Sequence, residues 1–240
     1  MPVDPVEKTS TGWSYVEFKE QLVRAESHLP PSELSLPPTI ETGAIGKELI
    51  RLEAETNSDP SRRERATVLK LNADGQLMMK NVSDVGTYHE VGASASIGFV
   101  PGTTVEVWVP GKNERVVMTL HSHPNDSPPS AQDLTGTVIT QETRQANVAE
   151  MIGTSNLNYL LLRTMQTAEV SPSEIDTWRT TWEEEFKQRA RSLPMMLTDD
   201  HLRAKTAVAQ YSVFRDMCNA HNVAVYTAPK GSTEYTRAKL

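Results

Sequence analysis

The segment HSHPNDSPPSAQD, residues 121–133, holds the residues best suited to chemistry in this chain. His121 and His123 stand two residues apart, and Asp133 follows after a proline-rich stretch. The preceding run RVVMTL is typical of a strand, which projects residues two apart to the same side, so both imidazoles can converge on one ion. Two histidines, a carboxylate and a water molecule form a known catalytic zinc arrangement. We predict that His121, His123 and Asp133 hold one zinc ion per chain.

The elements around these residues would bring the three side chains together. Pro124 cannot continue a strand ladder, and the turn after it folds the chain back before Ser130, a favoured residue at a helix N-cap. Asp133 would then lie in the first helical turn, with its carboxylate directed at the strand end. A purely structural interpretation stays open, because Ser-x-x-Asp also resembles a helix-capping arrangement and histidines are often ordinary polar residues.

The combined string resembles the signature of the JAMM, or MPN+, metalloprotease superfamily: H-[ST]-H-P, usually six residues, then S-x-x-D. One departure is visible, since only five residues separate the proline from the serine. The resemblance implies a zinc metallopeptidase that hydrolyses a peptide or isopeptide bond through a zinc-activated water, with the hydroxyl of the serine stabilising the oxyanion. The matching residues are His121, Ser122, His123, Pro124, Ser130 and Asp133.

In that superfamily a glutamate far upstream acts as general acid and base. Glu64 matches this role best, because the run ERATVLKL resembles a segment that precedes a hairpin in the bacterial RadC branch. Glu90, beside His89, and Glu106 are the alternatives. As a structural interpretation, a glutamate at a strand entrance is simply a solvated residue in most proteins.

Composition narrows the choice of partners and metal ligands. Lysine and arginine total 24 against 31 acidic residues, for a net charge of −7, which argues against a nucleic-acid partner. The single cysteine, Cys218, rules out an intrachain disulfide and a cysteine-based zinc cluster, and we interpret it as a small buried hydrophobe. His28, His201 and His221 are expected to be ordinary surface or hydrogen-bonded residues.

The N-terminus, MPVDPVEKTSTGW, has neither the basic start nor the apolar run of a signal peptide, and no stretch approaches the apolar length of a membrane span. We expect a cytoplasmic protein with no membrane partner. The resemblance implies a protein or peptide substrate, with a ubiquitin-like tail as one candidate, because better-known relatives cleave such bonds. The oligomeric state is left open.

The order of hydrophobic patterns predicts an α/β (α+β) fold, in which helices flank a mixed, largely antiparallel sheet. The resemblance implies the JAMM/MPN-like, cytidine-deaminase-like version of it, and the sequence pattern adds extra helices at both ends. We expect residues 1–40 to form an N-terminal helix and proline-rich linker, and 41–240 the metalloprotease domain with a helical extension at 171–221. Helices are predicted at 13–27, 43–56, 130–145, 171–192 and 199–220. Strands are predicted at 66–71, 76–82, 96–100, 104–109, 115–123, 148–153, 157–164 and 223–229.

Two further expectations concern an apolar face of one predicted helix and a proline-rich segment. The stripe of Ile175, Trp178, Trp182 and Phe186 has helical spacing and is expected to pack against the sheet. The prolines of residues 28–38 favour a linker or a strap on the surface.

Three other functions compete with the peptidase. A non-catalytic MPN-like interaction scaffold usually loses metal ligands, whereas this chain keeps them. A RadC-like protein linked to DNA maintenance or mobile elements is disfavoured by the acidic net charge for direct DNA binding. In the third alternative the histidines and Asp133 are structural and hold no metal.

Overall fold

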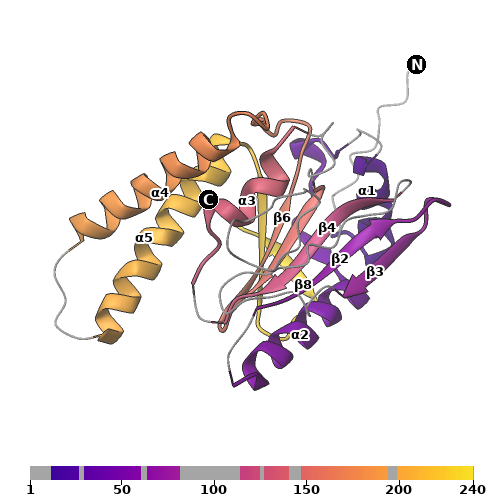
Figure 1. Ribbon diagram of the computed structural model, residues 1–240. Helices are drawn as coiled ribbons and strands as arrows, with labels where there is room; N and C mark the ends of the chain where they lie inside the picture. The colour runs from indigo at the N-terminus through magenta and orange to yellow at the C-terminus, as the bar shows by residue number, and fades with distance from the viewer. Residues whose placement is uncertain are drawn as a thin grey trace, which may run out of the picture.

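In the computed structural model the described residues are 12–26, 30–60, 64–81, 114–124, 127–140, 147–193 and 199–239. They build one eight-stranded sheet with helices on both faces (Figure 1). The strand order is β1-β8-β7-β6-β5-β4-β2-β3. The strands are β1 (Thr39–Glu41), β2 (Arg65–Leu71), β3 (Leu77–Asn81), β4 (Arg115–Ser122), β5 (Ala149–Gly153), β6 (Leu157–Leu162), β7 (Ala224–Pro229) and β8 (Glu234–Arg237).

The sheet is mixed and largely antiparallel, which confirms that part of the predicted fold. Only β4 and β5 pair in parallel among the described strands, and every other neighbouring pair is antiparallel. Parallel neighbours require a crossover connection, and here it contains a short helix, α3. The helices are α1 (Tyr15–Glu26), the 3-10 turn η1 (Glu33–Ser35), α2 (Gly43–Ser58), α3 (Ala131–Val138), α4 (Ile175–Ser192) and α5 (Asp199–Ala220).

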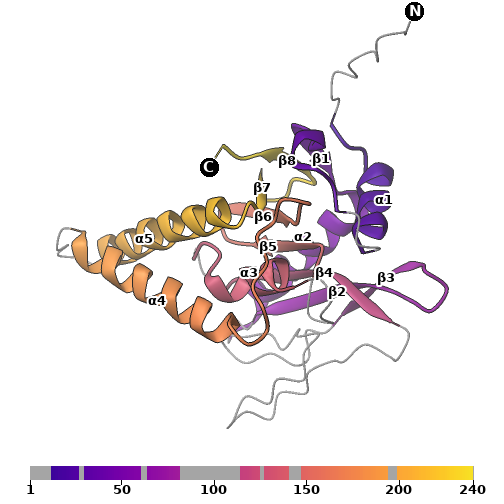
Figure 2. The same ribbon diagram turned by 90° about the horizontal axis from the view of Figure 1, so that it is seen from above.

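Two apolar clusters cover the two faces of the sheet. Successive side chains of a strand point to opposite faces, and β5 follows this rule, with Met151 in one cluster and Ile152 in the other. Helices α1 and α2 contribute to the first cluster, and α3, α4 and α5 to the second. Figure 2 shows the pair α4 and α5 extending side by side beyond the sheet.

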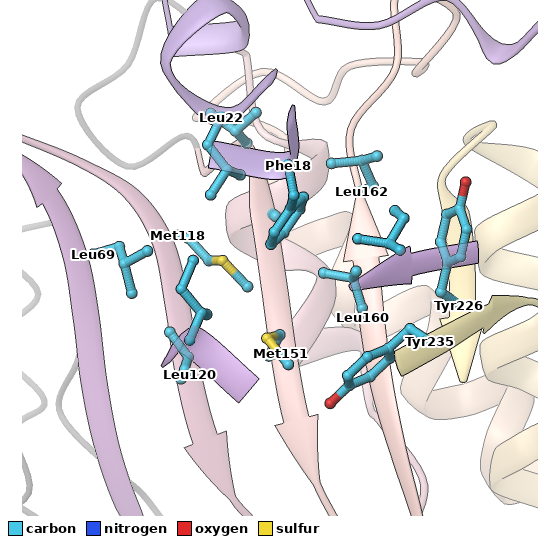
Figure 3. Packing of buried hydrophobic residues seen from close by; sticks show 14 of the residues in the cluster. Phe18, Leu22, Leu69, Met118, Leu120, Met151, Leu160, Leu162, Tyr226 and Tyr235 are labelled. Atoms are coloured by element: carbon cyan, nitrogen blue, oxygen red, sulfur yellow. The ribbon is translucent and has the colours of Figure 1, made fainter. Parts of the chain in front are cut away.

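The N-terminal helix belongs to the same core as the sheet. Figure 3 shows Phe18 and Leu22 of α1 directed towards Met118 and Leu162, and both α1 side chains are fully buried. The proline-rich segment after α1 is tied down as well, since the hydroxyl of Tyr226 donates to the carbonyl of Pro37 at 2.9 Å. Residues 30–38 therefore form a strap in which Pro31, Leu36 and Pro37 are buried and Leu34 is exposed.

The stripe on α4 packs mainly helix against helix, which corrects its predicted place on the sheet. Ile175, Trp178, Trp182 and Phe186 are partly buried against the second cluster, and the main neighbours of α4 are α5 and α3. Helix α4 has no fully buried residue. The stripe anchors the projecting helix pair to the body.

Most predicted elements are confirmed, but the end of one helix is wrong. The helix predicted at 130–145 ends at Val138, because Ile139 is extended and bridges to Val170. The short strands β1 and β8 were not predicted. The strands predicted at 96–100 and 104–109 lie outside the described residues. No helix in the described part of the chain has both the length and the apolar character needed to cross a membrane.

Candidate metal centre

The candidate centre lies where β4 ends and α3 begins. His121 belongs to β4, His123 follows directly after it, and Asp133 lies in the first turn of α3. Helix α3 lies in the connection between the parallel strands β4 and β5. Its N-terminus therefore lies near the C-terminal ends of these two strands. The backbone N–H of His123 donates to the carbonyl of Gly153 at 2.7 Å, which holds this histidine against β5 beyond the end of its strand.

The three potential ligand atoms form a compact triangle. His121 Nε2 lies 3.1 Å from His123 Nε2 and 3.1 Å from Asp133 Oδ1, and His123 Nε2 lies 3.6 Å from that same oxygen. Zinc bonds of about 2.0–2.2 Å in tetrahedral geometry separate ligand atoms by about 3.3–3.5 Å. The triangle therefore fits a tetrahedral zinc ion that has its fourth position open.

The other ring nitrogens show which way the lone pairs point. His121 Nδ1 lies 3.3 Å from Glu150 Oε1, and His123 Nδ1 lies 3.0 Å from the carbonyl oxygen of Ser127. A carboxylate and a carbonyl only accept hydrogen bonds, so both contacts favour the tautomer with its proton on Nδ1. In neutral imidazoles both Nε2 lone pairs then face one another and Asp133. Such a cluster of lone pairs needs protons or a cation at its centre.

The electrostatics of the metal-free centre favour positive charge. Side-chain exposure is 12% for His121, 8% for His123 and 11% for Asp133. Burial disfavours the charged imidazoles, but Asp133 and Glu150 outweigh it and raise the pKa of His121 well above its ordinary value. The pKa of His123 is also raised, despite burial, mainly by Asp133. Burial opposes ionisation of Asp133, yet the two histidines hold its pKa well below the usual range.

The two oxygens of Asp133 have separate partners. Oδ1 faces the histidines, while Oδ2 accepts the hydroxyl proton of Ser130 at 2.8 Å and also its backbone N–H. Ser130 caps α3, as the Ser-x-x-Asp pattern predicts for the start of a helix. The capping interaction and a ligand role for Asp133 are therefore compatible, because they use different oxygens.

Glu64 lies beside the centre. In the β2–β4 ladder Arg65 is opposite Ser122 and Ala66 is opposite His121, so one further step places Glu64 opposite His123. Directly opposed residues of antiparallel strands project to the same face of a sheet. The charge of Glu64 contributes to the raised pKa of His123, after the larger effects of burial, Asp133 and His121. Glu90 and Glu106 lie outside the described residues.

Glu150 was missed by the sequence analysis. It lies on β5 next to Thr119 of β4, and its carboxylate contacts His121. Its second oxygen, Oε2, accepts from Asn147 Nδ2 at 3.3 Å. A signal was present in the sequence: one carboxylate inside the apolar run VAEMIG must find a polar partner if the strand is buried.

Among the described residues, His221 and Cys218 do not belong to the candidate centre. His221 is hydrogen-bonded elsewhere, since it accepts from Trp178 Nε1 at 2.7 Å and its Nδ1 lies 2.7 Å from the carbonyl oxygen of Ala168. Cys218 is fully buried, and burial raises the pKa of its thiol. The side chains of His28 and His201 lie outside the described part. Within that part, the one group suited to holding a metal is His121, His123 and Asp133.

Comparison with known proteins found no matching family model, and no curated protein or solved structure is similar to the chain at a significant level.

Proposed function

We propose that this protein is a zinc-dependent hydrolase of the JAMM type that cleaves a peptide or isopeptide bond. The observation that carries the proposal is the triangle of His121 Nε2, His123 Nε2 and Asp133 Oδ1, with both Nδ1 atoms directed at acceptors. This geometry supports a metal site, and the resemblance of the HSHP and SAQD segments to the JAMM signature supports the reaction.

Each residue of the centre has a chemical task in this proposal. The two histidines and Asp133 would hold a zinc ion, and its Lewis acidity would lower the pKa of a water molecule and polarise a scissile carbonyl. Glu64 accepts the proton of the attacking water and passes it to the leaving amine. Ser130 donates its hydroxyl to the developing oxyanion, for which the proton must turn away from Asp133 Oδ2.

The fold and the partners follow the same proposal. A mixed sheet with helices on both faces, and a helix crossing from β4 to β5 beside the centre, is compatible with the cytidine-deaminase-like arrangement expected for JAMM proteins. We propose a protein or peptide substrate, with a ubiquitin-like tail as one candidate, and a cytoplasmic location.

A hydrolysis screen with a matched variant tests the function. The zinc-loaded protein is assayed against fluorogenic peptides, a fluorogenic ubiquitin C-terminal amide and isopeptide-linked diubiquitin. Glu64→Gln keeps the shape of the side chain but removes the base, so we expect activity to fall about 10²-fold or more while zinc stays bound. The control is Glu234→Gln, an exposed glutamate on β8, which should keep full activity.

Hydrolysis that is unchanged in Glu64→Gln would overturn the role of this residue. Bound zinc with no hydrolysis of any substrate in the screen would contradict the peptidase and favour the non-catalytic scaffold.

A further inference from the structure

We propose that Glu150 is a positioning residue for His121, and that Asn147 and Thr119 hold Glu150 in place. The inference rests on the proposed zinc site, and it adds a second layer of residues that no part of the JAMM-like signature contains. Its basis is a continuous chain of polar contacts that runs from the β4–β5 ladder to the ring of His121.

The parallel register places the two side chains together. Thr119 pairs with Glu150 and His121 pairs with Ile152 along β4 and β5. Residues two apart on a strand share a face, so Thr119 and His121 lie on the same face as Glu150 and Ile152. Ile152 belongs to the cluster under α3, which identifies this face as the one that carries the candidate metal centre.

Glu150 is buried, so its carboxylate depends on a few polar partners within the protein. Its side chain is only 8% exposed, so its charge needs partners inside the protein. His121 Nδ1 lies 3.3 Å from Oε1, and Asn147 Nδ2 donates to Oε2 at 3.3 Å. The same amide nitrogen donates to Thr119 Oγ1 at 3.1 Å. The carboxylate is therefore held from one side by an amide and directs its other oxygen at the imidazole.

This arrangement has two consequences for His121. The carboxylate keeps the proton on Nδ1, so the lone pair of Nε2 faces Asp133 and His123. It also makes the ring a more basic ligand. Removal of such outer partners typically costs 10- to 100-fold in metal affinity.

The polar contacts of residue 150 favour a carboxylate over an amide at this position. Glutamine could accept from only one of its two neighbours, because its amide nitrogen would face either Nδ1–H of His121 or Nδ2–H of Asn147. Glu150→Gln should therefore weaken the orientation of His121 partly, and Glu150→Ala should remove it.

The test measures zinc affinity by competition with a chromophoric chelator for wild type, Glu150→Gln, Glu150→Ala and the control Glu234→Gln. We expect zinc affinity to fall about 10-fold for glutamine and up to about 100-fold for alanine, with no change in the control. Cobalt-substituted protein gives a second reading, since a misplaced His121 should alter the visible absorption bands of the ion. Asn147→Ala, which leaves Glu150 in place but unsupported, should give a smaller loss.

A direct measurement covers the case in which the Glu150 variants fail to fold. Long-range ¹H–¹⁵N spectra of the zinc-loaded wild type should show His121 protonated at Nδ1 and bound through Nε2. Wild-type zinc affinity and cobalt spectra in both Glu150 variants, or zinc on Nδ1 of His121, would overturn the inference while the proposed function stands. Failure of the wild type to bind zinc would overturn both.

Discussion

At the scale of single residues, the centre is defined by where each polar atom is directed. Asp133 divides its oxygens between the histidines and Ser130, and each histidine uses Nδ1 for an acceptor and Nε2 for the centre. The convergence of His121, His123 and Asp133 could be predicted from the sequence, because their spacing follows from local rules for a strand and a helix start. Glu150 could not be placed in the same way, since its contact with His121 depends on how β5 pairs with β4.

The raised pKa values of the histidines predict how pH acts on zinc binding. In the metal-free protein, protonated His121 and His123 stabilise the fold fully below about pH 6.5, the ordinary value for histidine, and this stabilisation is lost as pH rises through their raised pKa. Zinc binds only the neutral rings and must displace these protons. The increase in melting temperature on adding zinc should therefore be small at pH 6 and larger at pH 8.

The control for this titration is the double variant His121→Ala, His123→Ala, which should show no zinc-dependent shift at any pH. Differential scanning fluorimetry with and without zinc gives the measurement. A wild-type zinc shift of equal size at pH 6 and pH 8 would contradict the assignment of the histidines as ligands.

At the scale of elements, β4, α3 and β5 form one strand–helix–strand unit that assembles the centre. His121 at the end of β4 and His123 directly after it supply the imidazoles. The start of α3 supplies Asp133, and β5 supplies the carbonyl of Gly153 that holds His123. Glu64 lies directly before β2, on the other side of β4. The residues of the candidate centre thus lie in or directly beside four elements, and the sheet ladder fixes the three strands among them relative to one another.

Ser130 has a structural and a proposed chemical role, which two substitutions can separate. Alanine is a poor N-cap and should cost about 0.5–2 kcal/mol of stability, whereas glycine should cost only a few tenths. Both remove the hydroxyl, so both should lower the rate of hydrolysis, by about 10²-fold if the hydroxyl stabilises the oxyanion. Urea unfolding and the hydrolysis assay give the two readings. Wild-type activity in Ser130→Gly would leave only the capping role.

The elements differ in how far their sequence determines them. Hydrophobic periodicity was enough for most helices and for the β2–β3 hairpin, because the information is local. It was not enough for β1 and β8, which are only three and four residues long. These strands pair residues that are far apart in the sequence, such as Thr39 and Thr236. Helix α3 ends early because Ile139 bridges to Val170, a contact that residues 130–145 alone do not contain.

At the scale of the whole molecule, one sheet integrates segments from both ends of the described chain. Strand β1 pairs with β8, and α1 packs into the same apolar cluster as the central strands. Helices α4 and α5 form a projecting pair on the opposite side (Figure 1). An ion pair links the two helices as well, since Arg189 of α4 contacts Asp216 of α5 at 2.8 Å. The body that holds the centre therefore includes the N-terminal helix.

The buried position of α1 predicts a large stability effect far from the centre. Phe18 is fully buried, so Phe18→Ala should lower the free energy of unfolding by about 3–5 kcal/mol. Val16 on the same helix is 59% exposed, and Val16→Ala should change it by less than about 0.5 kcal/mol. Urea unfolding followed by circular dichroism measures both. Equal, small effects would show that α1 does not belong to the cooperative core.

The central claim is that His121, His123 and Asp133 hold zinc, and elemental analysis of protein purified without added metal tests it most directly. Wild type should contain close to one zinc per chain, and the double variant His121→Ala, His123→Ala should contain almost none while it keeps the circular dichroism spectrum of the wild type. Wild-type protein that holds no zinc, even after reconstitution with the metal, would contradict the account.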